Sequence, residues 1–163
     1  DSAISLGIGD ISAEDQKMID DCAHSMWAGI AAAKVGGRLT DLSSAIEKAI
    51  TSRGKYGIVR EYGGHGIGTA MHQEPHLLNY GSAGRGPKLV AGMALAVEPM
   101  IMLGSEKVRV ESDEWTVSTV DGSRAAHTEH TFALLPSGEL SVLTALDSGL
   151  AGLAPFGVTP AVL

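Results

Sequence analysis

The chain has 163 residues, enough for one domain with a substantial core. Hydrophobic residues make up 44% and charged residues 19%, which is ordinary for a globular protein, and the formal net charge is -7. This acidic balance argues against a nucleic-acid partner, because phosphate backbones need a basic face. The single cysteine excludes an intrachain disulfide, and no apolar run is long enough to span a membrane.

A first helix is predicted near the start of the chain. Ser12, followed three residues later by Asp15, is typical of a helix start. Apolar residues then recur at helical spacing, at Met18, Cys22, Met26 and Ile30. This helix is expected to end at Gly36-Gly37.

A second helix is expected to begin at Thr40, whose hydroxyl can cap it, with Asp41 favourable in its first turn. Its apolar stripe consists of Leu42, Ala45, Ile46, Ala49 and Ile50. Gly54 is expected to end it.

Strands are predicted after Gly54, where the apolar pattern changes to period two. They cover residues 56–62, 93–102, 115–120, 126–135 and 140–144. The third and fourth are expected to be joined by a turn at Asp121-Gly122. Helices followed by mostly antiparallel strands predict one α+β domain over residues 1–144. Residues 145–163, rich in Ala, Gly and Pro, are expected to form a loosely packed tail.

Three residues with metal-binding side chains stand where apolar or small residues are expected: His65 in GGHGIG, Glu98 in AVEPM and Glu129 in HTEHTF. A buried carboxylate costs several kcal/mol unless it is paired or bound to a metal. Because Arg and Lys are scarce nearby, a metal is the more economical partner. Taken singly, Glu98 could equally be part of a salt bridge, and His65 could be structural.

Other motifs fail on inspection. In residues 72–76, HQEPH, the glutamate is misplaced for HExxH and Pro75 would break the helix that motif needs. Gly64, Gly66 and Gly68 do not form G-x-G-x-x-G. Cys22 lies on an apolar helix face with no activating partner, which favours core packing over nucleophilic catalysis.

Three segments together resemble the methionine aminopeptidases. Residues 60–75 (REYGGHGIGTAMHQEP) are similar to the segment around that family's histidine metal ligand. Residues 94–100 (ALAVEPM) and 115–131 (WTVSTVDGSRAAHTEHT) are similar to the segments around its two glutamate ligands. The segments occur in the family's order and at similar spacing, so the resemblance implies a pita-bread fold.

Details of these segments separate subfamilies. Glu98-Pro99-Met100 and Thr128-Glu129-His130-Thr131 favour methionine aminopeptidase over the prolidases, which share the fold and a GHGIG-like segment. The short interval between His65 and Glu98 leaves no room for the long insertion of type II enzymes, which favours type I. The last segment and the tail resemble actinobacterial members.

The resemblance implies a set of metal ligands, since the family uses two Asp, one His and two Glu. His65, Glu98 and Glu129 match three of them, and Asp1 matches the second aspartate. The first aspartate and the N-terminal portion of the fold are then expected upstream of this chain. Two divalent ions (Co, Mn, Fe or Zn) are implied for a complete enzyme, and at most one is expected in this chain.

The resemblance also implies an activity, the metal-dependent removal of the N-terminal methionine from nascent proteins. Glu98 would act as general base for the attacking water, and His72 would hydrogen-bond the scissile peptide. Met71 and Trp115 would flank the methionine pocket, although Trp115 could equally pack in the core or against a strand. The implied enzyme is cytoplasmic and monomeric, acts near the ribosome, and binds neither nucleic acid nor membrane. This chain alone is expected to have little activity.

Two other functions stay open. One is an X-Pro peptidase of the same fold. The other is a pita-bread domain that has lost its metal and only binds peptides, which the presence of four matching ligands disfavours.

Overall fold

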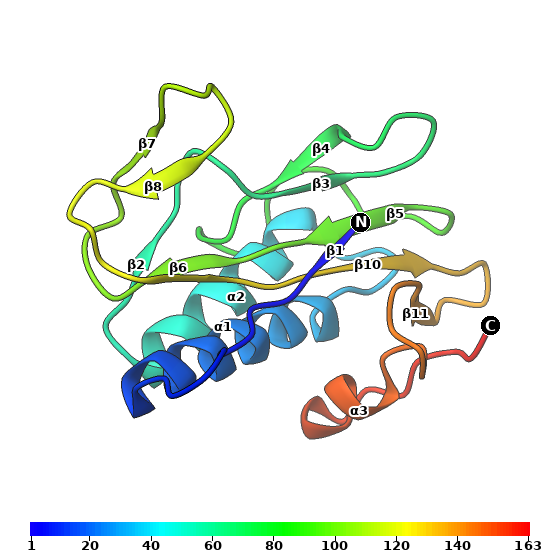
Figure 1. The fold of residues 1–163 in the computed structure, drawn as a ribbon. Helices are drawn as coiled ribbons and strands as arrows, with labels where there is room; N and C mark the ends of the chain where they lie inside the picture. The colour runs from blue at the N-terminus through cyan, green and yellow to red at the C-terminus, as the bar shows by residue number, and fades with distance from the viewer.

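The computed structural model describes the whole chain, from Asp1 to Leu163. Two long helices, α1 (Ala13–Ala31) and α2 (Leu39–Arg53), pack side by side against one face of an antiparallel sheet (Figure 1). The strands are β1 (Ser2–Ala3), β2 (Gly57–Ile58), β3 (Gly64–Gly66), β4 (Gln73–Leu77), β5 (Ala94–Val97), β6 (Met100–Met102), β7 (Val108–Val110), β8 (Val117–Thr119), β9 (Ala125–His127), β10 (Glu129–Leu134) and β11 (Leu140–Val142). The α+β class predicted from the sequence is confirmed.

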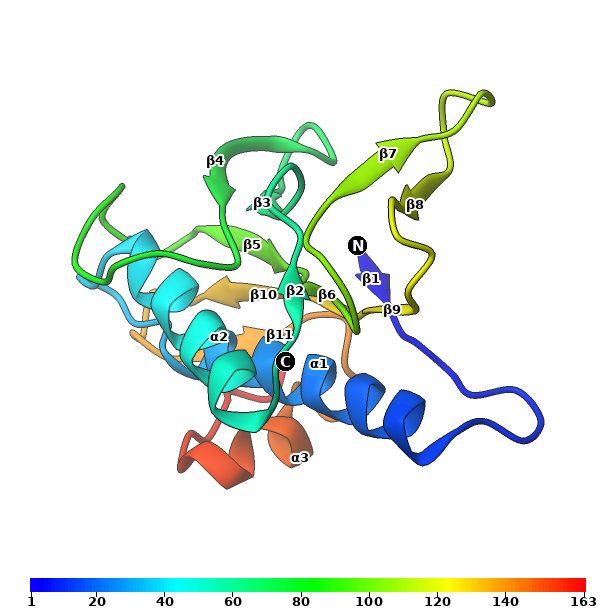
Figure 2. The same ribbon diagram turned by 90° about the vertical axis from the view of Figure 1, so that its left-hand side faces the viewer.

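The main sheet has the strand order β1-β10-β5-β3-β4, with β11 also paired to β10. Strands β2, β6 and β9 form a second sheet, and β7 and β8 form a separate hairpin that extends away from the body of the molecule (Figure 2). This order places β3, β5 and β10 next to one another, although they come from distant parts of the chain.

Helix α1 begins as predicted, with Ser12 as its N-cap and the Asp15 backbone N–H donating to Ser12 Oγ at 3.0 Å. It ends at Ala31, earlier than the predicted Gly36-Gly37. The glycines are not helical because Gly36 and Gly37 exchange backbone hydrogen bonds of 2.8 and 2.9 Å with Leu89. Pairing with a distant loop therefore shortens the helix.

The N-cap of helix α2 lies two residues before the predicted cap, Thr40. It is Arg38, whose backbone N–H donates to Asp41 Oδ2 at 2.8 Å, while the Thr40 hydroxyl donates to the Arg85 carbonyl. Gly54 ends the helix as predicted.

The core lies between the helices and the sheet. The predicted α1 stripe is almost fully buried, and so are Leu42, Ile46 and Ile50 of α2. Against them pack Leu95 and Val97 of β5 together with Phe132 of β10. This packing fixes the strands that carry the candidate site.

Several strand predictions were wrong in detail. Within the predicted strand 56–62, only β2 (Gly57–Ile58) is a strand. The apolar run 93–102 is divided at Glu98-Pro99 into β5 and β6, because proline has no N–H to donate to a strand partner. The segments 115–120 and 126–135 do not pair with each other. Strand β8 pairs with β7, and the second segment is divided into β9, which pairs with β6, and β10, which pairs with β5.

The C-terminal segment is better packed than the predicted loose tail. It contains α3 (Leu150–Leu153) and a 3-10 helix (Ala154–Phe156). Leu153 is fully buried in the core cluster, and the Phe156 ring lies 5.1 Å from that of His24 on α1. Contact with α1 thus extends the packed structure beyond residue 144. No helix of the structure combines the length and apolar character needed to cross a membrane.

Candidate metal centre

His65 is the central residue of the short strand β3, between β4 and β5. Neighbouring backbone crowds this strand: a Cβ at Gly64 would collide with the Ala96 carbonyl oxygen, and one at Gly66 with the Glu74 carbonyl oxygen. His65 Nδ1 lies 3.0 Å from the Gly66 carbonyl, which can only accept, so Nδ1 carries the proton. Nε2 is buried without a hydrogen-bond partner, and its lone pair faces the site.

Glu98 occupies the break between β5 and β6. The Asn79 amide nitrogen donates to the Glu98 carbonyl oxygen at 3.2 Å, and the Cys22 thiol lies 3.3 Å from the Pro99 carbonyl oxygen. Burial raises the pKa of Cys22 to about 12, so the thiol stays protonated and can donate. Glu98 Oε1 lies 3.4 Å from His65 Nε2. The break in the strand therefore turns a carboxylate toward His65.

Glu129 is the first residue of β10 and lies opposite Ala3 of β1. Its side chain is buried and Oε1 has no hydrogen-bond partner. Burial, and then the charge of Glu98, raises the pKa of this carboxyl, whereas His127 and His65 act in the opposite direction. Candidate ligand atoms of His65, Glu98 and Glu129 lie within 4.8 Å of one another.

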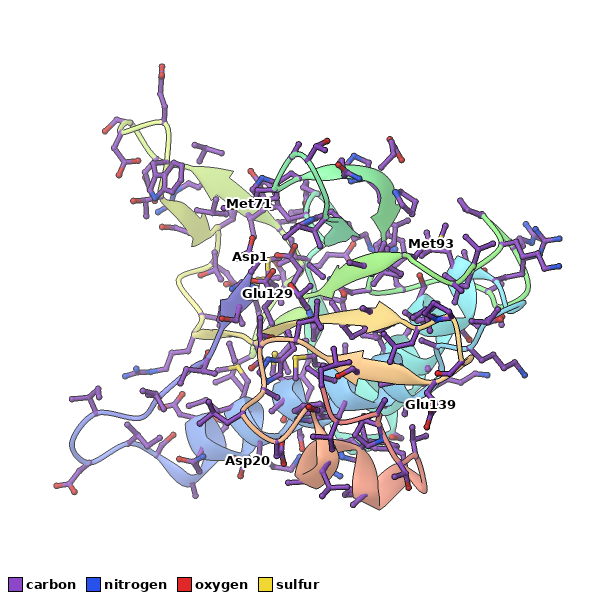
Figure 3. All side chains as sticks on the ribbon, turned by 90° about the vertical axis from the view of Figure 1, so that its right-hand side faces the viewer. Asp1, Asp20, Met71, Met93, Glu129 and Glu139 are labelled. Carbon is purple, nitrogen blue, oxygen red and sulfur yellow. The ribbon has the colours of Figure 1, made fainter.

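Asp1 directly precedes β1, the neighbour of β10, and approaches the same place (Figure 3). Its carboxylate lies 3.9 Å from His65 Nε2 and 3.8 Å from His72 Nε2, and these three side chains form a second group within 4.8 Å. The Asp1 carbonyl oxygen accepts from Thr131 Oγ1 at 2.8 Å, which ties the residue to β10. Asp1 thus shares His65 with the first group but is not a member of it.

A cavity of about 590 Å³ opens beside these groups and is lined by His65, His72, Glu98 and Trp115 among others. The His72 ring packs edge-on against the His65 ring, with centroids 4.4 Å apart. Trp115 is 87% exposed, so the alternative that it packs in the core is wrong. Met71 is exposed and does not line this cavity.

His127, the last residue of β9, also lies at the centre and was not predicted from the sequence. Its Nε2 lies 3.4 Å from Glu98 Oε2. His127 and Glu129 are two positions apart, and alternation along a strand would have placed both on one face. That signal was available, but the break at Thr128 between β9 and β10 obscured it.

The donor set suits a divalent metal. It offers one imidazole nitrogen and several carboxylate oxygens, and two of these atoms, His65 Nε2 and Glu129 Oε1, are buried without a partner. No Lys or Arg lies within ion-pair distance of Glu98 or Glu129, and the basic side chains that could form a salt bridge with Glu98 are His65 and His127. A cation would relieve the repulsion between the two carboxylates and satisfy both orphaned atoms.

Comparison with known proteins agrees with this geometry. The family model of metallopeptidase family M24 matches residues 1–134. The chain belongs to that family.

Its relatives carry a more specific name. The chain is 50% identical over 138 residues to a methionine aminopeptidase of Clostridium acetobutylicum, a match that covers 85% of this chain and 55% of that protein. It is also 50% identical over 143 residues to methionine aminopeptidase 1 of Mycobacterium tuberculosis, covering 85% and 54%. The chain therefore spans about half the length of the curated relatives it matches.

Solved structures give the fold. A methionine aminopeptidase from Thermotoga maritima superposes with a TM-score of 0.83 at 36% identity, covering 88% of this chain and 57% of that one. A prolidase from Pyrococcus furiosus, at 20% identity and a TM-score of 0.66, shares the fold alone. The pita-bread fold and the resemblance to methionine aminopeptidases predicted from the sequence are confirmed.

Proposed function

We propose that this chain is the part of a methionine aminopeptidase that carries most of its metal ligands, and that the whole protein hydrolyses the bond after an N-terminal methionine. One observation carries the proposal: His65, Glu98 and Glu129 converge, with His65 Nε2 and Glu129 Oε1 buried and unpaired, in a chain that is 50% identical to proteins of that name. The less similar prolidases support only the fold.

The proposed metal ligands are Asp1, His65, Glu98 and Glu129, with Co, Mn, Fe or Zn as the ion. When bound, a divalent metal lowers the pKa of water and polarises the carbonyl to be attacked. A complete enzyme holds two ions in this proposal, and this chain holds at most one.

The remaining roles belong to side chains of the chain itself. Glu98, with an oxygen facing the centre, accepts the proton of the attacking water. His72, exposed at the cavity and in contact with His65, donates a hydrogen bond to the scissile peptide as negative charge develops there. Trp115 borders the substrate, and Met71 completes the methionine pocket only if its loop moves toward the cavity.

The proposal also covers the substrates, the cellular location and the oligomeric state of the enzyme. The substrates are the N-termini of nascent polypeptides, met near the ribosome. The protein acts as a cytoplasmic monomer, without direct binding to nucleic acid or membrane.

Metal analysis combined with peptide cleavage tests the proposal. Purified protein should contain a divalent metal and release methionine from Met-Ala-Ser in preference to cleaving an X-Pro peptide. The 163-residue chain should show little turnover, whereas the longest protein that its coding DNA specifies should be active. Preferred X-Pro cleavage would establish the prolidase alternative, and absence of metal from both proteins would favour a peptide-binding domain.

His72→Ala in the active protein tests the assigned donor. Its kcat should fall roughly 10²–10³-fold, the usual cost of removing one such hydrogen bond. Metal content should stay equal to that of the parent. Loss of metal would instead make His72 a ligand, as its group with Asp1 and His65 would allow.

A further inference from the structure

The carboxylate of Glu98 lies between two histidines. Oε1 is 3.4 Å from His65 Nε2, and Oε2 is 3.4 Å from His127 Nε2. These histidines are the only basic side chains within ion-pair distance of it. The two oxygens of Glu98 therefore have different surroundings, one toward the candidate metal centre and one toward β9.

His127 is fixed in place by its backbone. Its N–H donates to Ser5 Oγ at 3.0 Å, and the Ser5 hydroxyl lies 2.9 Å from the His127 carbonyl oxygen. It also pairs with Met100 in the β6–β9 register. The ring is partly exposed, yet Nε2 is buried and has no hydrogen-bond partner. A rigid backbone thus holds a buried, unused donor position beside Glu98.

We infer that His127 is a positioning residue that holds Glu98 Oε2 through Nε2–H, so that Oε1 is presented to the metal. This inference rests on the proposed function. A glutamate side chain has several rotatable bonds, and fixing one of its oxygens removes most of the freedom of the other. Hydrogen-bond partners of metal ligands act in this way, and their loss typically lowers metal affinity about 10–100-fold.

The geometry distinguishes this role from that of a ligand. His127 is absent from the two groups whose donor atoms lie within 4.8 Å of one another. Its Nε2 approaches Glu98 Oε2, whereas His65 Nε2 approaches Oε1. His127 therefore acts on the metal through Glu98.

Substitutions of His127 by side chains of different length test whether it holds Glu98. His127→Gln keeps an N–H donor at nearly the same distance, whereas His127→Asn has a similar amide that is too short, and His127→Leu has none. His24→Gln, on α1 and packed against Phe156, is the control for loss of a histidine elsewhere. Circular dichroism checks that each variant is folded.

Titration calorimetry with Co²⁺ measures affinity, and the visible absorption of bound Co²⁺ reports coordination geometry. The Asn and Leu variants should bind about 10–100-fold more weakly, with an altered spectrum. The Gln and His24 variants should match the parent.

Two results would overturn the inference alone: parental affinity and spectrum in the Asn or Leu variant, or a Gln variant as weak as Leu. If the parent itself binds no Co²⁺, the proposed function fails and this inference fails with it. If Gln keeps the fold but loses an ion that His binds, His127 is a ligand and the positioning role is wrong.

Discussion

Asp21, on the helical side of the molecule, and Glu129, at the candidate metal centre, are both buried carboxylates. Asp21 accepts hydrogen bonds from Arg53 at 2.6 Å and Tyr56 at 2.7 Å, and it also pairs with Lys17. Burial alone would raise its pKa, but these bonds outweigh burial and lower it. For Glu129 burial and a second carboxylate both raise the pKa, and Oε1 has no partner.

The same contrast holds for the two regions as a whole. Six buried side-chain atoms lack a hydrogen-bond partner, and three of them belong to His65, His127 and Glu129. An unpaired buried polar group costs about 1–3 kcal/mol, so a cluster of them persists where something else binds. The polar groups of the helical region are satisfied by the chain itself, whereas the candidate centre has buried polar atoms that the chain leaves unpaired.

The largest effect is expected from a cavity in the helical region. Ile46 of α2 is fully buried. It packs so closely on Gly29 of α1 that a Cβ at Gly29 would collide with the Ile46 side chain. Ile46→Ala should lower the free energy of unfolding by about 2–5 kcal/mol, measured by urea denaturation. Metal affinity of the folded protein should be unchanged. A metal affinity that falls with stability would show that the two regions are not independent.

His65→Ala should lower metal affinity and leave the stability of the metal-free protein nearly unchanged. Removing a residue that only hydrogen-bonds to a metal ligand lowers metal affinity about 10–100-fold, so removing this ligand itself should weaken metal binding at least about 100-fold. The melting temperature without metal should change little. His76→Ala is the matched control, since His76 pairs with His65 across the β3–β4 ladder but its side chain is exposed. Equal metal content in the His65 variant and the parent would remove His65 from the ligand set.

Asp21→Asn tests the satisfied carboxylate. Hydrogen bonds to a charged group contribute about 1.5–3 kcal/mol, and the variant should lose stability of this order at pH 7. The folded pKa of Asp21 lies below the ordinary value of 3.8, so its stabilisation is present above that value and is lost as the pH falls through the folded pKa. The difference in urea midpoint between parent and variant should therefore be constant above about pH 5 and shrink below about pH 4. A difference that grows in acid would mean that Asp21 is protonated in the folded state.

The helices could be predicted from the sequence because their signals are local. The Ser12 cap, the four-residue apolar spacing and the stop at Gly54 all act within a few residues. The end of α1 could not be predicted, because it depends on hydrogen bonds between Gly36-Gly37 and Leu89, far along the chain. Strand partners are equally non-local: the turn at Asp121-Gly122 joins β8 and β9, which pair with different strands.

The candidate centre was predictable only in part. His65, Glu98 and Glu129 stood out because each interrupts an apolar or glycine-rich segment, and the family resemblance supplied their roles. Their convergence depends on β3, β5 and β10 being neighbours, which spacing along the chain does not contain. The place of Asp1 beside His72, and of His127 beside Glu98, likewise required the folded sheet.

The smallest effect is expected from the local signal that starts α1. The Ser12 side chain accepts from the Asp15 backbone N–H at 3.0 Å and is its only capping contact. Ser12→Ala leaves that N–H without a side-chain acceptor and should lower the free energy of unfolding by about 1 kcal/mol. Ser12→Asp should retain the cap, since a carboxylate accepts the same bond and also suits the positive end of the helix. Ser12 lies ten residues before Cys22, the residue of α1 whose thiol contacts the carbonyl oxygen of Pro99, next to Glu98. Co²⁺ affinity should therefore be equal in the parent and in both variants, measured by calorimetry beside urea unfolding. If Ser12→Ala weakened Co²⁺ binding by ten-fold or more, local stability of α1 would be transmitted to the metal centre, and the separation between the two regions would not hold.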